Sequence, residues 1–384
     1  MIPKTSVSLS DIRLATVYKL LGDEELARVK AETICIEQTI EFPADLIADD
    51  DIHAKIFGQI ESFDRVDEFH FEAKISYAVE SSGFELTQLL NLIFGNSSIK
   101  PGIRVERLEL PESLLKAFKG PRFGRDGLRN YLGTEKQKRP LLCTALKPMG
   151  LSAKSLADYA YQFALGGIDM IKDDHGLADQ SFSPFEERVE LCAAAVARAN
   201  AETGFKSIYI PNITAPSNQM VDKARFAKKV GAGGLMIAPG LAGYDIMRQI
   251  ADDDEIALPI LAHPALQGSF VLNTDSGISH HALFGQFARL AGADATIFPN
   301  HGGRFSFSKE ECQNIVDGTE VEMSHLKSIF PAPGGGMSLD RLDEMSEFYG
   351  KDVIYLIGGD LHRHGGDIAE NSRHFREMVK LGGE

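Results

Sequence analysis

The 384-residue sequence has no tryptophan, only four cysteines and no long apolar run. The cysteines stand far apart without CxxC spacing, which argues against a disulfide framework or a thiolate zinc site and favours a reducing compartment. They are Cys35, Cys143, Cys192 and Cys312. No stretch approaches the ~20 consecutive apolar residues of a membrane span, and the N-terminus lacks the charged start and apolar core of a secretory signal. We therefore expect a cytoplasmic protein with no membrane partner.

Positive charge is also scarce. The chain has 40 Lys and Arg against 55 Asp and Glu, a formal net charge of −15. This balance argues against an electrostatic partnership with nucleic acid or anionic lipid, so any bound phosphate must be held locally. The apolar fraction of 43% and charged fraction of 25% are typical of a globular protein, and the length allows about two or three domains.

From residue 141 onward, short apolar runs alternate with longer amphipathic stretches. Eight runs are predicted as strands: 141–147, 168–174, 206–212, 234–239, 258–263, 294–299, 327–333 and 352–358. Continuous apolar strands alternating with helices indicate a parallel sheet buried on both faces. Eight such units in residues 141–384 predict an α/β fold with a C-terminal (β/α)8 TIM barrel, in preference to a doubly wound open sheet.

Residues 1–135 have a different pattern and predict a separate, smaller N-terminal α+β domain of ferredoxin-like type. Residues 33–42 and 67–79 alternate in polarity and are predicted as half-buried antiparallel strands, and residues 84–95 as a helix. The polar segment 133–140, which ends in proline, is the predicted linker to the barrel.

Barrel enzymes place the active site at the carboxyl ends of their strands, so polar residues there are candidates. They include Lys147, Lys172, Asp173, Asp174, His175, Asn212, Thr214, His263, Asn300, His301 and Arg304. Lys172 and Asp174 share a face because side chains alternate along a strand. With His175 they form either an ion pair that caps the strand or a site for a hard metal ion. Lys172 could join a metal site only as an anionic carbamate, because an ammonium group would repel the cation.

The remaining candidates each allow two readings. Lys147 is a possible general acid/base or a solvated charge, and His263 is an active-site histidine or one satisfied by a backbone carbonyl. Glycine clusters follow the last two strands, at 334–336 and 358–359. They are either tight turns or, at the place where barrel enzymes often hold phosphate, loops whose N–H groups bind it; two clusters on adjacent strands favour phosphate.

Several motifs, in order, resemble the ribulose bisphosphate carboxylase/oxygenase (RuBisCO) large chain superfamily. They are TALKPMGLSAKSLADYAYQFALGGIDMIKDDHG, FARLAGADATIFPN, PAPGGGM and YLIGGDLHRHGGDI in the barrel, and FGNSSIKPG and FKGPRFGRDGLRNYLG before it. The likeness covers residues 90–384 well and residues 1–90 only in outline.

The resemblance implies a role for each matching position. Lys172 corresponds to the carbamylated metal-ligand lysine, Asp174 to the metal-binding aspartate, and His175 replaces a glutamate ligand. Lys147 corresponds to the strand-one catalytic lysine and His263 to the strand-five active-site histidine. Gly335, Gly336, Gly358 and Gly359 match the phosphate loops. Asn96 matches an asparagine that reaches the site of a neighbouring subunit, which implies a homodimer, or a multiple of dimers, with shared sites.

The departures from the family pattern exclude carbon fixation. KPMG lacks the second lysine of the KPK motif, and the loop PNHGGRF lacks the mobile lysine that positions carbon dioxide. Two further histidines of the family and its N-domain tryptophan are also missing. The chain therefore resembles the RuBisCO-like proteins. His175 in place of glutamate removes one negative charge, so Mg²⁺ should bind more weakly and Mn²⁺ or another divalent ion should be better tolerated.

Activities of this superfamily share an enolate or enediolate of a phosphorylated keto compound. Additional cationic candidates near the mouth favour a keto sugar acid; they are His301, Arg304, His362, Arg363 and His364. We therefore expect a decarboxylase or transcarboxylating hydrolase such as one acting in 3-oxo-isoapionate 4-phosphate breakdown. The alternatives are a methionine-salvage enolase or 5-methylthioribulose-1-phosphate isomerase and, in another class, a non-catalytic protein that binds a sugar phosphate. Asn212, Asn300, His301 and Arg304 are the predicted substrate-binding side chains.

Overall fold

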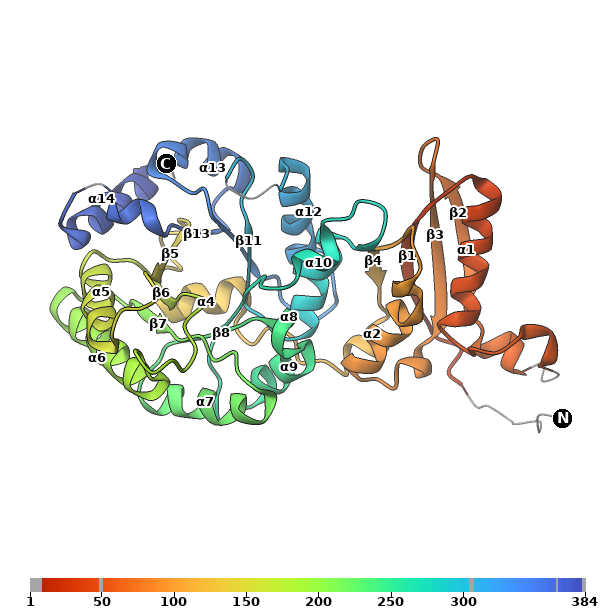
Figure 1. Cartoon of the computed structure of the whole chain (residues 1–384), viewed down its shortest axis with the longest axis horizontal. Helices are drawn as coiled ribbons and strands as arrows, with labels where there is room; N and C mark the ends of the chain where they lie inside the picture. The colour runs from red at the N-terminus through yellow and green to blue at the C-terminus, as the bar shows by residue number, and fades with distance from the viewer. Residues whose placement is uncertain (1–8, 48–50, 304–306, 364, 382–384) are drawn as a thin grey trace.

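The computed structural model describes residues 9–47, 51–303, 307–363 and 365–381, which form a small N-terminal domain beside a barrel (Figure 1). The N-terminal domain has the β-α-β-β-α-β order of a ferredoxin-like fold, as predicted. Its antiparallel strands lie in the order β4-β1-β3-β2, and helices α1 and α2 follow β1 and β3. The bounds are β1 Arg13–Leu21, α1 Glu24–Glu37, β2 Gln59–Arg65, β3 His70–Ala78, α2 Leu86–Phe94 and β4 Ile103–Glu109.

The predicted strand over 33–42 is wrong, because its first half completes helix α1. Asp23 caps this helix by accepting a hydrogen bond from the Leu26 N–H at 2.9 Å. Ala27, Ala31, Ile34 and Cys35 then recur at helical spacing and are all buried, so packing against the sheet outweighs the β propensity of the isoleucines and Thr33. The predicted strand at 67–79 is confirmed as β3 and the helix at 84–95 as α2.

All eight predicted barrel strands are confirmed. They are β5 Leu141–Leu146, β6 Met170–Asp173, β7 Ile208–Ile210, β8 Leu235–Ile237, β9 Ile260–Ala262, β11 Ala295–Pro299, β12 Phe330–Gly334 and β13 Ile354–Leu356. They are parallel and lie in the order β7-β6-β5-β13-β12-β11-β9-β8. A parallel bridge between Asn212 and Met236 joins β7 to β8 and closes the ring.

Helices surround the strands (Figure 1). The main ones are α5 Ala153–Leu165, α6 Phe185–Thr203, α7 Ser217–Lys229, α9 Tyr244–Asp252, α12 Lys309–Glu320, α13 Leu342–Tyr349 and α14 Ile368–Leu381. After β9, a π-helical segment η5 (His281–Phe287) runs into α11 (Ala288–Leu290). Shorter helical turns are η1 Ala44–Leu46, η2 Ile52–Ile56, η3 Val79–Ser82, η4 Asn96–Ile99, α3 Glu112–Leu115, α4 Gly124–Leu132, α8 Pro239–Ala242, α10 Gly268–Val271, η6 Leu339–Arg341 and η7 Gly359–His362.

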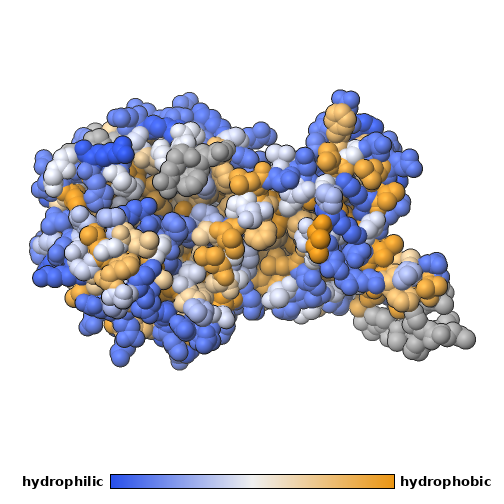
Figure 2. Space-filling model, in the orientation of Figure 1, coloured by the Kyte–Doolittle hydropathy of each residue, from blue (hydrophilic) through white to orange (hydrophobic). Residues whose placement is uncertain are grey.

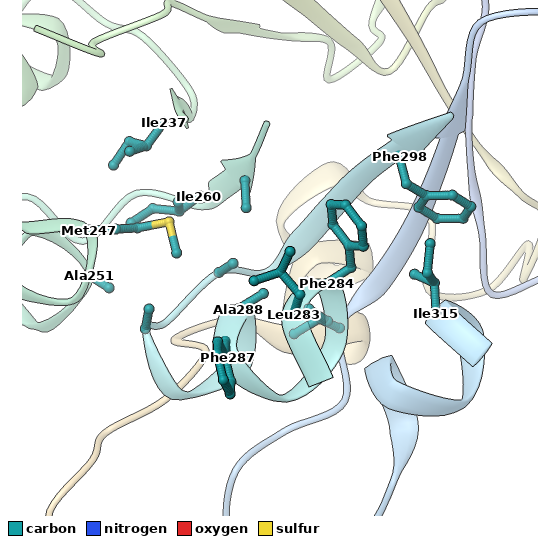
Figure 3. Close-up of a cluster of buried hydrophobic side chains, with 14 of the residues drawn as sticks. Ile237, Met247, Ala251, Ile260, Leu283, Phe284, Phe287, Ala288, Phe298 and Ile315 are labelled. Carbon is teal, nitrogen blue, oxygen red and sulfur yellow. The ribbon is translucent and has the colours of Figure 1, made fainter. Parts of the chain in front are cut away.

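The barrel has two apolar layers with different members. Inside the ring, one buried cluster contains Cys143, Met170 and Ile210 from three neighbouring strands, and Leu128 and Leu132 of α4 pack with it. Outside the ring, strand residues pack against the helices. Figure 3 shows this outer layer, in which Ile237 and Ile260 approach Met247 of α9, and Phe298 lies near Phe284 and Ile315. The inner cluster fills the ring with apolar side chains. Polar side chains at the next inward positions of the strands, towards their carboxyl ends, therefore reach the mouth.

The two domains are joined by main-chain and side-chain hydrogen bonds. Strand β10 (Gly277–Ile278), in the connection after β9, pairs in parallel with β4. The Gln286 amide accepts from the Leu108 N–H and donates to the Leu108 carbonyl, both at 2.8 Å. These contacts fix the N-terminal sheet to the outside of the barrel. Within the described residues, no helix is long and apolar enough to cross a membrane.

Candidate active site at the barrel mouth

Lys172 lies at the base of the candidate site. It follows the inward-facing Met170 on β6, and its side chain is 2% exposed. Its Nζ donates to the Asp173 carbonyl at 2.9 Å. Burial lowers the pKa of Lys172, and the charge of Lys147 adds to this effect, while Cys143 and Asp174 oppose it. Burial thus favours the neutral amine, the form that can react with carbon dioxide to give a carbamate.

Asp174 lies between two basic groups above Lys172. Its Oδ1 is 3.3 Å from the Lys147 Nζ and 3.3 Å from the His175 Nδ1. Burial by itself would raise the pKa of Asp174, but the interaction with His175 and the charges of Lys147 and Lys172 outweigh it and hold this pKa well below its usual range. The carboxylate is therefore ionised at neutral pH, and the predicted proximity of these four side chains is seen in the structure.

His263 joins the same group from β9. Its ring stacks on that of His175 with 4.7 Å between centroids and 14° between planes. Burial, followed by the charge of Lys172, lowers the pKa of His263 to about 2, so the ring is neutral. Its Nδ1 accepts the Ala265 N–H at 3.2 Å, which leaves the proton on Nε2. His263 can therefore donate a hydrogen bond to a ligand from Nε2.

The metal hypothesis depends on Lys172. Among the described residues, no group of three or more His, Cys, Asp or Glu side chains could hold a metal ion. An ionised Asp174, the adjacent His175 and a buried amine suited to carbamate formation do fit a divalent cation, because the carbamate would replace the missing third ligand. Without carbamate formation on Lys172, Asp174 and His175 alone of this proposed set could act as ligands.

Asn212 and Asn300 use their side chains within the protein. The Asn212 Nδ2 donates to the carbonyls of His175 and Leu177, at 3.0 and 2.9 Å, and so holds the loop after β6. The Asn300 Nδ2 contacts the sulfur atoms of Met337 and Met345, and its Oδ1 accepts from the Tyr349 hydroxyl at 2.7 Å. Both asparagines are buried. Among the described residues, neither amide contacts the side chain of Asp174 or of the basic residues around it.

The remaining predicted ligands are distributed around the rim. His301 is buried against Phe348, and burial lowers its pKa. Arg304 and His364 lie outside the described residues. Asn96 is exposed in η4 of the N-terminal domain, where its Nδ2 lies 3.5 Å from Glu37 Oε1. Within the described part of one chain, neither His301 nor Asn96 contacts Lys172, Asp174 or His263.

The four glycines end two neighbouring strands, as predicted, but their surroundings differ. Gly335 and Gly336 have φ of 74° and 86°, and a Cβ on Gly336 would lie 2.3 Å from the Gly303 Cα, so backbone packing requires glycine there. A Cβ on Gly358 or Gly359 would meet nothing within 4 Å. Their N–H groups have no acceptor among the described residues. The loop after β13 therefore has space and free donors for an anion.

From the sequence, Asp173 is predicted only as one of the polar candidates for the mouth, which is wrong, and Met149 is assigned no role. Asp173 alternates with the inward-facing Lys172 and Asp174, so it faces the helices, where its buried carboxylate pairs with Arg188 of α6. The alternation along the strand was the signal for this outward direction. Met149 follows Lys147 and is 55% exposed, an unusual place for a large apolar side chain. A Cβ on Gly176 would lie 3.4 Å from its sulfur, so Met149 lies beside the loop that carries His175.

Known proteins that resemble this chain show its family. Residues 126–378 match the family described as ribulose bisphosphate carboxylase large chain, catalytic domain. The chain belongs to the RuBisCO large chain superfamily. It is 37% identical to ribulose bisphosphate carboxylase-like protein 1 of Rhodopseudomonas palustris, with 97% of this chain and 99% of that protein covered. A crystal structure of a Rubisco-like protein from that organism superposes with a TM-score of 0.87 at 37% identity, covering 98% of this chain and 99% of the other.

Two further relatives of this RuBisCO-like protein have named activities. It is 37% identical to the 5-methylthioribulose-1-phosphate isomerase of Rhodospirillum rubrum, over 96% of each chain. It is 31% identical to the 2,3-diketo-5-methylthiopentyl-1-phosphate enolase of Geobacillus kaustophilus, over 94% of this chain and 90% of the enolase. The predicted family and fold are confirmed, and the named relatives are an isomerase and an enolase.

Proposed function

We propose that this RuBisCO-like protein transfers a proton on a phosphorylated keto sugar with an apolar tail, as an isomerase or enolase that passes through an enediolate. The observation that carries the proposal is the group of Lys147, Asp174, His175 and His263 above the buried Lys172. Such a group combines a lysine that can carry a proton with hydrogen-bond donors for a substrate oxygen on which negative charge develops. The isomerase and enolase named above are related along nearly the whole chain, which supports the same reaction class.

Each side chain has a distinct task in this proposal. Lys147 is partly exposed and is positioned by Asp174, so a substrate can reach its amino group. In its neutral form this group would take a proton from a substrate carbon, and as an ammonium it would return the proton. The His263 Nε2–H donates to the oxygen on which negative charge develops. The N–H groups of Gly358 and Gly359, which have no acceptor among the described residues, bind the phosphate in this proposal. A divalent cation held by a Lys172 carbamate, Asp174 and His175 would add stabilisation of the enediolate charge.

The choice of an apolar tail rests on Met149. Met149 is two residues after Lys147 in the sequence, and its exposed side chain lies beside the loop that bears His175. A substrate bound over Lys147 would therefore contact it. A methylthio group would cover this apolar surface. The sugar-acid reaction expected from the sequence has less support, because His301 is buried and His362 packs edge-on against Tyr159 and Phe163. Neither histidine adds a positive charge that a substrate carboxylate could reach.

We also infer that a second copy of the chain completes the site. Asn96 is exposed, and Glu37, to which its side chain donates a hydrogen bond, lies in the same N-terminal domain. Leu241, Leu266, Phe270 and Leu272, at the carboxyl side of β8 and β9, are exposed large hydrophobics. Figure 2 shows hydrophobic residues gathered on this face where the barrel meets the N-terminal domain. Exposed apolar area of this kind is typical of a protein–protein interface.

The proposed reaction is tested with purified protein, with and without Mg²⁺ or Mn²⁺, in D₂O. The substrates are 5-methylthioribulose 1-phosphate, the 2,3-diketo-5-methylthiopentyl 1-phosphate and a phosphorylated keto sugar acid. We expect deuterium incorporation with a methylthio substrate, and a fall of ~10²–10⁴-fold in turnover for Lys147→Met. Lys154→Met, exposed on α5, is the matched control and should retain activity. Carbon dioxide release would instead indicate the sugar-acid reaction, and binding without exchange or turnover would indicate a non-catalytic protein.

The tail assignment has its own measurement. Ribulose 1-phosphate is the matched substrate that has a hydroxyl group in place of the methylthio group. We expect Met149→Lys to reduce the ratio of kcat/KM values for the two substrates by ~10-fold, and Met149→Leu to preserve it. An unchanged ratio in Met149→Lys would mean that the tail binds elsewhere.

A further inference from the structure

A buried polar network lies on the face of β6 opposite to Lys172 and Asp174. Asp173 and Arg188 form an ion pair in which both side chains are 0% exposed, with Arg188 Nε 3.2 Å from Asp173 Oδ2. The same oxygen accepts the Asn212 N–H at 3.1 Å, and Asp173 Oδ1 accepts from the Tyr209 hydroxyl at 2.8 Å. One carboxylate thus connects β6, β7 and helix α6.

The network extends into residues 174–184, which connect β6 to α6 and begin with the two candidate ligands. The Arg188 Nη1 donates to the Ser183 carbonyl and its Nη2 to the Ala178 carbonyl, each at 2.7 Å. Asn212, whose own N–H is bound by Asp173, donates from Nδ2 to the carbonyls of His175 and Leu177. Four carbonyls of the connection are therefore held by two side chains that share Asp173 as their anchor.

We propose that Asp173 is a positioning residue that sets the places of Asp174 and His175 through Arg188 and Asn212. Asp173 does not face the mouth, since Lys172 and Asp174 occupy the inward positions of the strand. It acts by orienting donors that hold the connection at both ends. The metal-binding and catalytic consequences rest on the proposed function, but the ordering of the connection does not.

The other end of β6 supplies a matched comparison. Asp169, just before the strand, is also buried, and its carboxylate accepts from both Nη atoms of Arg139 at 2.7 Å. It also accepts the Leu142 N–H at 2.9 Å. This pair has similar burial and hydrogen bonding but lies at the amino end of the strand, away from the mouth. Asp169→Asn therefore perturbs a buried ion pair without touching the connection after β6.

The experiment compares Asp173→Asn with Asp169→Asn by hydrogen exchange of the full-length protein without metal or substrate. We expect exchange of peptides covering residues 174–183 to rise at least ~10-fold in Asp173→Asn and to stay near the wild-type rate in Asp169→Asn. Tyr209→Phe removes one hydrogen bond and keeps the ion pair, so it should give a smaller rise in the same peptides. That variant tests the proposal if Asp173→Asn does not fold. Faster exchange spread evenly over the barrel, or confined to other peptides, would overturn it.

A second readout separates positioning from stability. Mn²⁺ affinity, measured by electron paramagnetic resonance in bicarbonate buffer, should fall ~10–100-fold in Asp173→Asn and less than about twofold in Asp169→Asn. Equal losses in the two variants would assign Asp173 a structural role only. If the wild type binds no Mn²⁺, the metal part of the proposed function fails, while the hydrogen-exchange result still decides the role of Asp173.

Discussion

The pKa values of two residues near the barrel mouth are both lowered, but for different reasons. Lys172 is pushed towards the neutral amine, whereas Asp174, only two positions further on, is kept ionised by the basic groups beside it. The difference follows from partners as well as from depth. Asp174 has Lys147 at 3.3 Å, whereas the hydrogen bond of the Lys172 Nζ within the described residues goes to a main-chain carbonyl. The result is a neutral amine close to an ionised carboxylate, and perturbed pKa values of this kind are typical of functional sites.

His280 allows a residue-scale prediction of pH dependence away from the mouth. It is 2% exposed, and burial lowers its pKa to about 4, with Glu311 opposing the shift and Arg104 adding to it. In the unfolded chain the pKa is ~6.5, so the unfolded state binds the proton first as the pH falls. The stability associated with neutral His280 is complete above pH ~6.5 and is lost as the pH falls towards 4.

The measurement is urea unfolding at pH 7.5 and pH 5. Relative to His280→Gln, the wild type should lose about 2 kcal/mol of unfolding free energy between these two conditions. His374→Gln, exposed on α14, serves as the control and should keep the wild-type pH dependence. Equal pH dependence in wild type and His280→Gln would show that His280 does not titrate on unfolding.

At the scale of elements, close helix contacts decide where glycine is required. Segment η5 and helix α12 meet at Gly285 and Gly318. A Cβ on Gly285 would lie 2.3 Å from the Gly318 carbonyl carbon, and a Cβ on Gly318 would lie 2.3 Å from the His281 oxygen. Both contacts are with backbone, which cannot move aside as a flexible side chain can. The two segments can therefore approach this closely only because neither residue has a side chain.

Gly285→Ala should consequently destabilise the protein by about 2–3 kcal/mol through overpacking. Gly268→Ala is the matched control, because its Cβ would meet only a Leu272 methyl carbon at 3.7 Å and its φ is not positive. That variant should change stability by less than about 1 kcal/mol. Chemical denaturation of the two variants gives both values. A Gly285→Ala protein as stable as Gly268→Ala would mean that the two segments separate at little cost.

For the whole molecule, the domain arrangement determines whether one chain can complete its own site. The N-terminal sheet is fixed to the barrel through β10, through Gln286 and through a hydrogen bond between the His70 Nε2 and Asp275 at 3.1 Å. None of these contacts involves Asn96. With the domain held in this way, Asn96 is available to a neighbouring molecule, in agreement with the proposed dimer.

A complementation experiment tests the shared site. Asn96→Ala and Lys172→Ala proteins should each be nearly inactive, and after subunit exchange the mixture should regain about one quarter of wild-type activity, because half of the dimers would then contain one intact site. Differently tagged subunits that copurify verify the exchange. If verified exchange restores no activity, each site is built within a single chain or Asn96 has no part in it.

Much of the barrel follows from local sequence, since parallel strands buried on both faces must be continuously apolar and end in polar residues at the mouth. The eight strands, the shared face of Lys172 and Asp174, and the candidate group with Lys147, His175 and His263 were predictable for that reason. The strand expected at 33–42 was wrong, because residues 33–37 complete a helix that is capped by Asp23 and buries Ile34 and Cys35. Local propensity is weak compared with burial against a sheet.

Only the tertiary structure decided what the polar residues face. The sequence placed Asn212 and Asn300 beside the mouth, but their amides are bound to loop carbonyls and to methionine sulfur. Asp173 required an ion-pair partner 15 residues away, and Met149 stands exposed beside a loop that sequence spacing does not bring near it. The sequence by itself determined the composition, with no tryptophan and four scattered cysteines, and the alternation of apolar and amphipathic stretches that indicates a barrel. Side-chain direction and partners depend on long-range packing, which no local pattern specifies.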